Sequence, residues 1–137
     1  MVLGVTSLVL QQPALRAELV APDTVQAGAP VRFTIRITNQ TDKAVDAYFV
    51  GREIAFDIVV TRADGQIVWQ RLAGKGVQMV LQTRIMQPEE SLELGDTWRQ
   101  QDNDRIPVPA GSYTVEGRVP GQGREMLKTA SRVLVIR

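Results

Sequence analysis

The chain has 137 residues, of which 44% are hydrophobic and 23% are charged, and its formal net charge is +1. It contains no cysteine and no histidine, which excludes disulfides, thiolate metal sites and the catalytic arrangements that use an imidazole as general base. Its 16 cationic residues are strung out singly and form no basic cluster, and the chain has only seven aromatic residues, so we do not expect nucleic-acid binding. No apolar run is long enough to cross a bilayer, so we expect no membrane span.

The first ten residues, MVLGVTSLVL, are apolar and uncharged. They lack the basic beginning and the small-residue cleavage site of a complete signal peptide. We expect a strand at a sheet edge, and the remnant of a signal peptide is the alternative. A cysteine-free chain suits a reducing cytoplasm, whereas a signal remnant would place the protein outside it, so the compartment stays open.

Short segments in which apolar and polar residues alternate follow one another along the chain. The clearest lies between Val31 and Ile37, where every second residue is apolar, as on a strand with one buried face. Prolines, glycines and polar runs separate the segments about every ten residues, which predicts an all-β antiparallel sandwich in a single domain. The expected strands cover residues 15–21, 31–38, 45–50, 56–61, 66–70, 92–98, 113–119 and 130–136.

A hairpin is expected in the middle of the chain, where two of these strands flank Asp64-Gly65. This dipeptide predicts a tight turn in which both central residues have positive φ. Ile67 and Trp69 then share the buried face of the second strand. Residues 75–81 are the only segment with helical character, and they are too short and too rich in Val to form a stable helix.

We expect residues 15–137 to form the sandwich and residues 1–14 to precede it as an apolar segment. The expected core consists of apolar residues on one face of each strand: Phe33, Ile35, Phe56, Ile58, Trp69, Leu94, Trp98, Tyr113 and Val115. Tyr113 follows Gly111 as in a tyrosine corner, where the hydroxyl bonds to the backbone. The tryptophans would bind a sugar or a peptide if exposed, but their apolar neighbours favour burial.

Acidic residues near one loop are the strongest indication of a metal site. Asp96, Asp102 and Asp104, together with Asn103, offer the oxygen ligands that Ca²⁺ prefers. Their spacing matches no EF-hand loop, and Asp and Asn also cap turns, so we expect a capping role and neither metal nor cofactor. The adjacent Glu89-Glu90 would point to opposite faces of a strand and form no catalytic pair. Nothing in the chain indicates an enzyme.

Two long loops are the candidate contact surfaces, because a rigid sandwich usually presents its recognition residues on loops. Residues 71–79 are rich in glycine, and residues 99–108 are polar. A plain connector is the alternative for each loop. The candidate protein-binding residues are Lys75, Val77 and Met79 in the first loop and Arg105 and Ile106 in the second.

Several short motifs occur in a fixed order between residues 31 and 119: Phe33 with Thr38-Asn39, Phe56-Asp57, Asp64-Gly65 before Val68-Trp69, Leu92 before Thr97-Trp98, and the segment VPAGSYTVEG at residues 108–117. In this order they resemble the BsuPI family of intracellular proteinase inhibitors, whose domain is an immunoglobulin-like β-sandwich. The chain departs from the family in three places. The family often has glycine where Glu89 and Arg105 stand, and an aromatic residue where Val77 stands.

The resemblance implies a protein-binding module that inhibits a subtilisin-like serine protease through an exposed loop held in an extended form. The missing aromatic residue at Val77 lies within a candidate contact loop. The alternative is a non-inhibitory immunoglobulin-like domain that serves interaction or assembly in a bacterial envelope protein. Whether the purified chain slows a subtilisin-like protease and stays intact distinguishes the two.

Overall fold

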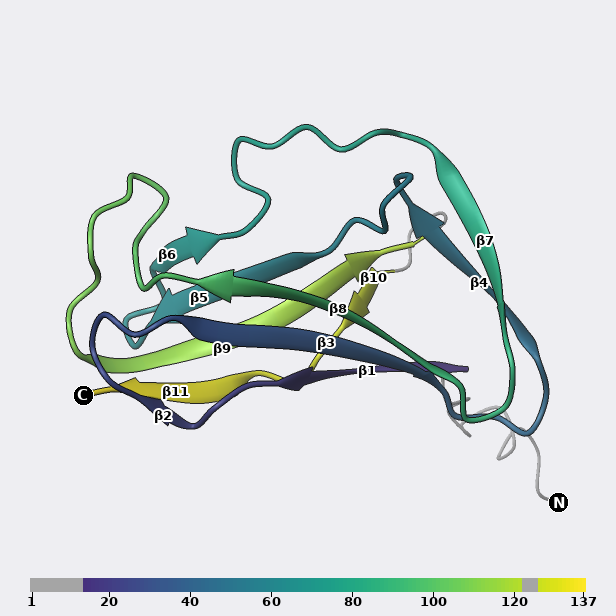
Figure 1. Cartoon of the computed structure of the whole chain (residues 1–137), viewed down its shortest axis with the longest axis horizontal. Coiled ribbons are helices and arrows are strands. Elements are labelled where there is room, and N and C mark those ends of the chain that lie inside the picture. The colour runs from purple at the N-terminus through teal and green to yellow at the C-terminus, as the bar shows by residue number, and fades with distance from the viewer. Residues whose placement is uncertain (1–13, 122–125) are drawn as a thin grey trace, which may run out of the picture.

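The computed structural model describes residues 14–121 and 126–137; the first ten residues, for which we expect an edge strand or a signal remnant, lie outside this range. The described residues form strands, turns and loops and contain no helix (Figure 1). In chain order the strands are β1 (Leu15–Val20), β2 (Thr24–Val25), β3 (Val31–Asn39), β4 (Val45–Val50), β5 (Asp57–Arg62), β6 (Ile67–Gln70), β7 (Leu81–Met86), β8 (Ser91–Trp98), β9 (Gly111–Pro120), β10 (Met126–Lys128) and β11 (Arg132–Ile136).

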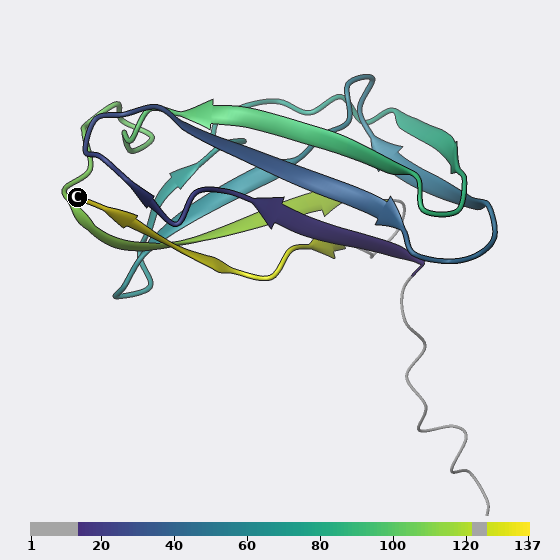
Figure 2. The same cartoon turned by 60° about the horizontal axis from the view of Figure 1, so that its bottom comes forward.

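The strands form two layers that face each other across a shared core (Figures 1 and 2). One layer has the strand order β1-β3-β8, and the other has the order β2-β11-β9-β5-β6 with β10 paired to β9. The pairs are antiparallel except for β11 with β2. A separate two-stranded sheet, β4-β7, lies at one end of the molecule. The arrangement confirms the immunoglobulin-like β-sandwich predicted from the sequence.

The alternation in β3 produces the buried face that the sequence predicts. Val31, Phe33, Ile35 and Ile37 are at most 1% exposed, while Arg32 between them is exposed. β3 lies between β1 and β8 and pairs with both, so its backbone groups are satisfied on both edges. Its apolar face packs toward the second layer.

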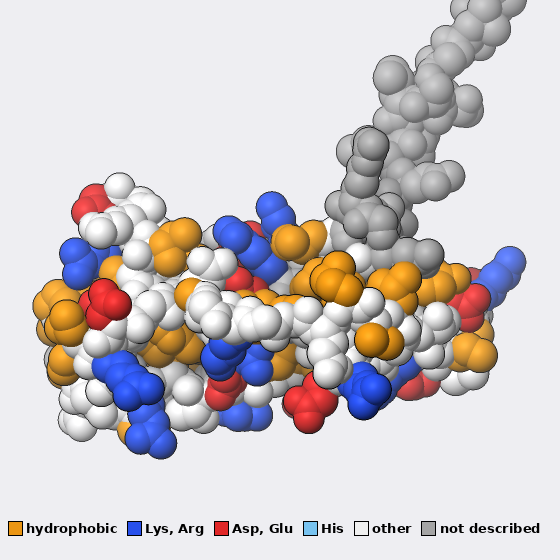
Figure 3. Space-filling view, turned by 90° about the horizontal axis from the view of Figure 1, so that it is seen from above, with side chains coloured by type: hydrophobic (Ala, Val, Ile, Leu, Met, Phe, Trp, Pro, Cys, Tyr) orange, Lys and Arg blue, Asp and Glu red, His pale blue; other side chains and the backbone are white. Residues whose placement is uncertain are grey.

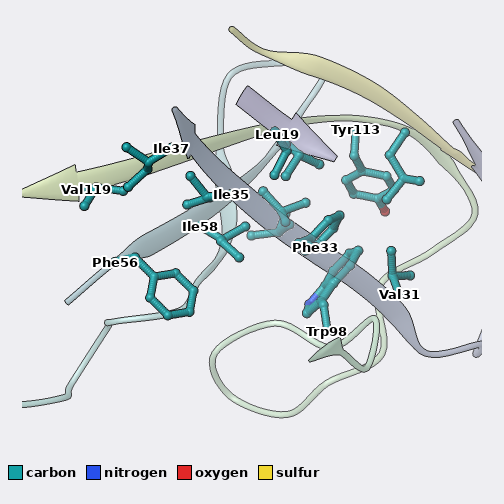
Figure 4. Close-up of a cluster of buried hydrophobic side chains, with 14 of the residues drawn as sticks. Leu19, Val31, Phe33, Ile35, Ile37, Phe56, Ile58, Trp98, Tyr113 and Val119 are labelled. Atoms are coloured by element: carbon teal, nitrogen blue, oxygen red, sulfur yellow. The ribbon is translucent and has the colours of Figure 1, made fainter. Parts of the chain in front are cut away.

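Trp98 occupies the centre of the aromatic cluster in the core (Figure 4). Its ring stacks on Phe33 and Trp69 with centroid distances of 6.1 Å and 5.9 Å, and it meets Tyr113 edge-on at 6.3 Å. The indole Nε1 donates a hydrogen bond of 2.8 Å to the carbonyl oxygen of Gln101, so burial leaves no donor unpaired.

Most of the expected core is buried, and Trp69 and Leu94 are half-buried at its margin. The burial of Trp98 argues against the sugar- or peptide-binding interpretation of the tryptophans. The hydroxyl of Tyr113 donates to the carbonyl oxygen of Pro109. This bond, four residues upstream, confirms the tyrosine corner.

The β5–β6 hairpin forms where the sequence predicts it, but its turn is of another kind. Gly65 N donates to Arg62 O at 2.9 Å, and Arg62 N donates to Gln66 O at 2.8 Å. Gly65 has a φ of 91°, whereas Asp64 has no positive φ. The loop therefore has three residues, 63–65, with a left-handed glycine after an ordinary turn. The expectation of positive φ at both Asp64 and Gly65 is wrong.

A bulge in this hairpin turns Ile67 outward and buries Val68, while Trp69 still packs against the core. Val60 pairs with Trp69, whereas Thr61 pairs with Ile67, so Val68 is an additional residue on β6. Val68 is buried and Ile67 is 49% exposed. The expectation that Ile67 lies on the buried face is wrong, because an additional residue shifts the alternation by one.

Three strands, β2, β7 and β10, were not expected from the sequence. β7 begins at Leu81, the last residue of the segment with weak helical character, and residues 75–80 before it form neither helix nor turn. β7 pairs with β4 in unbroken register, from Leu81 opposite Val50 to Met86 opposite Val45. This long-range pairing, which local sequence does not reveal, sets the strand conformation.

Three described residues other than glycine have positive φ: Glu89 at 64°, Gln100 at 56° and Arg105 at 66°. Glu89 and Arg105 are positions at which the resembling family often has glycine. Residues with a Cβ adopt this left-handed conformation at a cost that glycine does not bear. Glu89 therefore strains the backbone in the turn after Pro88, and Arg105 strains it in the second candidate loop.

We predict that Trp98→Ala lowers the free energy of unfolding by about 3–5 kcal/mol, because it empties the centre of the aromatic cluster. Denaturation with urea measures the loss. Val133→Ala is the control, since Val133 is 61% exposed and its truncation leaves the core intact. A loss below about 1 kcal/mol for Trp98→Ala would contradict the assignment of the ring to the core.

We also predict that Glu89→Gly raises the free energy of unfolding by about 1 kcal/mol, because glycine relieves the strain at φ 64°. Glu90→Gly is the matched control one residue away. Glu90 has no positive φ, and its Oε1 accepts a hydrogen bond of 3.0 Å from Gln87 N, so this substitution should destabilise the turn. Equal losses for the two variants would show that Glu89 is not strained.

Candidate functional site

The two candidate loops leave the sandwich at different places (Figure 1). The loop between β6 and β7 runs toward the β4-β7 end of the molecule, and the loop between β8 and β9 lies at the opposite end. The tip of the second loop meets the start of the first where Asn103 Oδ1 accepts from Gln70 N and Asn103 Nδ2 donates to Gln70 O, both at 2.9 Å. The structure connects the loops at this point but does not gather the five predicted contact residues into one cluster.

Asp102 holds the tip of the second loop. Its Oδ1 accepts hydrogen bonds from Asp104 N at 2.8 Å and from Ile106 N at 2.9 Å, and its own N donates to Ile106 O at 2.8 Å. Arg105 and Ile106 form the exposed tip. The result is a compact, internally bonded turn.

The buried side chain of Gln100 fixes the base of the same loop. Its Nε2 donates to the carbonyl oxygens of Gln26 at 2.7 Å and Ala29 at 2.8 Å. Its Oε1 accepts from Gly28 N at 3.1 Å. These bonds tie the loop to the connection between β2 and β3, so the loop is rigid at its base as well as at its tip.

Three of the four residues that suggest a calcium site, Asp96, Asp102 and Asn103, are engaged within the chain. Asp96 pairs with Arg71 at 2.8 Å, Asp102 caps the loop tip, and Asn103 bonds to Gln70. In residues 14–121 and 126–137 no group of three or more acidic side chains could hold a metal ion. The observed geometry is the capping role that Asp and Asn usually play in turns.

Arg71 anchors the start of the first loop. Its Nε donates to Asp96 Oδ2 and its Nη1 to Phe56 O, both at 2.8 Å, and its guanidinium carbon lies 3.6 Å from the centroid of the Phe56 ring. Buried Asp57 accepts a hydrogen bond of 3.0 Å from Leu72 N and one of 2.8 Å from the side chain of Gln70. The two networks hold residues 70–72 against the edge of β5.

Residues 75–80 are anchored at both ends. Lys75 N donates to Leu72 O at 3.0 Å, and Val80 O accepts from Gly51 N at 2.6 Å. No turn interrupts the segment between these two bonds. Val77 is half-buried and lines a cleft of about 460 Å³ between this loop and residues 51–55, whereas Lys75 is exposed and Met79 is 86% exposed.

Sequence reasoning missed the exposed apolar residues Val80, Leu81 and Ile85, at the end of this segment and in β7. Val80, Leu81 and Ile85 are exposed together with Met79, and Tyr48 on the neighbouring strand is 43% exposed. Figure 3 shows hydrophobic side chains over the end of the molecule where β4 and β7 lie. The alternation of Leu81, Thr83 and Ile85 was visible in the sequence, but such a pattern normally indicates a buried face.

Burial raises the pKa of Asp96. The hydrogen bonds from Thr97 N and Arg71 and the positive charges of Arg71 and Lys75 lower it by more than burial raises it. The pKa therefore lies below its ordinary value of 3.8. Asp96 remains ionised at neutral pH and accepts the hydrogen bond from Arg71 that anchors the first loop.

The sequence matches the family of intracellular proteinase inhibitors, BsuPI, over residues 19–124. No curated protein sequence matches the chain. In the described part of the chain, no helix is long and apolar enough to cross a membrane.

Solved structures share the fold at low sequence identity. The sporulation control protein Spo0M of Bacillus subtilis aligns with a TM-score of 0.57 and 14% identity over 92% of this chain and 50% of its own. The alkylpurine DNA glycosylase AlkC of Pseudomonas fluorescens aligns with a TM-score of 0.50 and 8% identity over 90% of this chain and 30% of its own. A CARDB domain of Pyrococcus furiosus has a TM-score of 0.49 and 13% identity, over 93% of this chain and 96% of the domain. The chain thus spans half of Spo0M and a smaller part of the glycosylase, and the alignments with these two show the fold alone.

We predict that the contribution of Asp96 to stability is present above about pH 4 and is lost in acid. A carboxylate with a lowered pKa in the folded state stabilises the fold above its unfolded pKa, and this contribution disappears as the pH falls through the folded value. Urea denaturation of the wild type and Asp96→Asn should therefore differ near neutral pH and converge at low pH. Glu53→Gln, at an exposed position, is the control. An equal difference at both pH values would mean that the charge of Asp96 contributes nothing.

Proposed function

The chain belongs to the BsuPI family of intracellular proteinase inhibitors, and we propose that it blocks a subtilisin-like serine protease by docking an exposed loop in the protease cleft. Family membership is the observation that carries this proposal. Because the family consists of inhibitors, the chain is not an enzyme, as the lack of catalytic motifs led us to expect. The family implies a proteinase as the partner.

Of the two loops, we assign the contact to residues 75–80. Little entropy is lost on docking when the binding segment is already fixed in the bound form. The Arg71 network holds one side of this segment, and the bond from Gly51 N to Val80 O holds the other. The absence of any turn between them suits the strand-like pairing with which clefts receive extended peptides.

The side chains of residues 75–80 suit the substrate cleft of a subtilisin-like protease. Met79 offers an apolar side chain that is 86% exposed, and Lys75 adds one exposed charge. Val77 faces the cleft of the inhibitor itself, so we assign it a supporting part in shaping the segment. Binding energy at such interfaces concentrates in a few anchors, and Met79 is the proposed anchor.

The second loop fits a supporting role better than a contact role. Its hydrogen bonds make it rigid, but the left-handed Arg105 and the cap by Asp102 fold its tip into a compact turn. Such a turn does not present consecutive residues in extended form. Arg105 and Ile106 therefore provide the matched comparison for the first loop.

We place the protein in the cytoplasm. The family is described as intracellular, and a chain without cysteine needs no oxidising compartment for its stability.

One observation favours a second candidate function. The exposed apolar residues of β7 suit a non-inhibitory interaction or assembly domain, such as an immunoglobulin-like module of a bacterial envelope protein. In that case the sandwich would bind partners through the β4-β7 end and would leave proteases unaffected.

We predict that the purified chain inhibits subtilisin at micromolar concentration or below and emerges intact, and that Met79→Asp abolishes the inhibition. A charge at the proposed anchor would be buried against an apolar pocket of the protease. Titration of subtilisin activity against a small chromogenic substrate measures the effect. Val77→Asp should act in the same direction, with some loss of stability because Val77 is half-buried.

Ile106→Asp is the matched control, since Ile106 is also apolar and is 59% exposed. It should leave inhibition and stability nearly unchanged. Loss of inhibition in Ile106→Asp but not in Met79→Asp would transfer the contact to the second loop. If the wild-type chain inhibits no serine protease at micromolar concentration, the inhibitor proposal fails and the second candidate takes its place.

A further inference from the structure

β7 has one edge without a partner in the described part of the chain. Its other edge pairs with β4 over Leu81–Met86 without a register shift. Natural edge strands are commonly shielded by a proline, a bulge or inward-pointing charges. β7 contains no proline and no bulge, and its one charged residue, Arg84, lies on the same face as Met86 but remains exposed. An edge of this kind is a template for pairing with another strand.

The hydrogen bonds of β4 with β7 show which backbone groups this free edge offers. Gly51 N donates to Val80 O at 2.6 Å, so these two residues form a hydrogen-bonded pair. In an antiparallel ladder such pairs alternate with pairs whose N–H and C=O groups point away from the partner. Leu81, Thr83 and Ile85 therefore direct their backbone groups to the free edge.

The same three residues form the outer face of β7. Leu81 is 56% exposed, Ile85 is 64% exposed, and Thr83 between them is exposed. Tyr48, which lies opposite Thr83 on β4, extends this apolar face to the neighbouring strand. Free backbone groups and exposed apolar side chains thus coincide on one strand, where a partner strand would satisfy both.

We propose that the partner is a second copy of this chain, paired antiparallel through β7 about a two-fold axis at Thr83. The sequence of β7 is complementary to itself in this register: Leu81 lies opposite Ile85 of the second copy, and Thr83 lies opposite Thr83. Apolar pairs and Thr–Thr pairs are among the favourable cross-strand neighbours. Gln82 lies opposite Arg84, so no like charges face each other. The interface is isologous and closes as a dimer.

The charge of Arg84 and the positions of the apolar residues favour the register centred on Thr83. Moving the axis by one residue to Arg84 would place two guanidinium groups directly opposite each other, which is destabilising. Moving it to Gln82 would remove Ile85 from its apolar partner Leu81. Arg84 thus permits the register centred on Thr83 and disfavours the register centred on Arg84 itself.

The dimer and the inhibition are tested separately. The strand pairing covers Leu81 to Ile85, and Met79, the proposed anchor, lies two residues before it. The dimer is tested by cross-linking and mass, and the inhibition by titration of subtilisin, so failure of one proposal is distinguishable from failure of the other.

Single cysteines test the register directly, because the chain has none of its own. Thr83→Cys should form a disulfide-linked dimer under mild oxidation, since directly opposite residues lie within disulfide reach. Leu81→Cys and Ile85→Cys should form few homodimers alone but a linked heterodimer when mixed. Val133→Cys, at an equally exposed strand position, is the control and should remain monomeric. Equal self-linking of all three β7 variants would indicate parallel or unspecific contact and would overturn the proposal.

The mass of the unmodified full chain provides the second test. Sedimentation equilibrium should give a mass approaching twice 15.1 kDa as the concentration rises. Ile85→Arg should return the mass to that of the monomer, and circular dichroism should show that the variant remains folded, because the side chain is exposed. Val133→Arg should still dimerise. A wild-type chain that stays monomeric at high concentration, or an Ile85→Arg variant that dimerises as before, would overturn the proposal.

Discussion

The packing of the Trp98 indole ring between the two layers is the interaction on which the rest of the structure depends. It belongs to β8 in one layer, stacks on Phe33 in the same layer, and contacts Trp69 and Tyr113 in the other. Its N–H group bonds to Gln101 at the base of a long loop. One side chain thus couples the two layers to each other and to a loop. This explains how a chain without disulfides keeps both layers and that loop in fixed relation.

Buried polar side chains hold the loops in place by hydrogen bonds, as Trp98 holds the two layers together by packing. Gln100 fixes the second candidate loop, and Asp57 fixes the start of the first. Asn39 is fully buried, and its Nδ2 donates to Met86 O at 3.0 Å and Lys43 O at 2.8 Å, which ties the end of β3 to the β4-β7 sheet. Since a buried polar group without a partner is costly, each of these residues imposes one loop path.

At β7 the function that we propose and the dimer that we infer lie next to each other. Residues 75–80 lead directly into a strand whose outer face is apolar and whose free edge carries neither a proline nor a bulge. The rest of the surface mixes charges of both signs, as the strand faces with Arg36 beside Glu18 and Glu93 illustrate. Recognition by this protein is therefore expected at the β4-β7 end and in the loop that precedes it.

The sequence by itself determined the class of fold, the main strands and most of the core, because alternation in segments such as residues 31–37 depends on local period and hydrophobicity alone. It also determined the capping role of Asp102 and the corner at Tyr113. Only the tertiary structure decided which face β6 buries, because the bulge at Val68 depends on pairing with β5. It likewise decided that β7 is a strand with an exposed apolar face, since Leu81, Thr83 and Ile85 show the pattern of a buried strand. Whether such a face is covered depends on which strands lie beside it, and that is set by contacts between residues far apart in the chain.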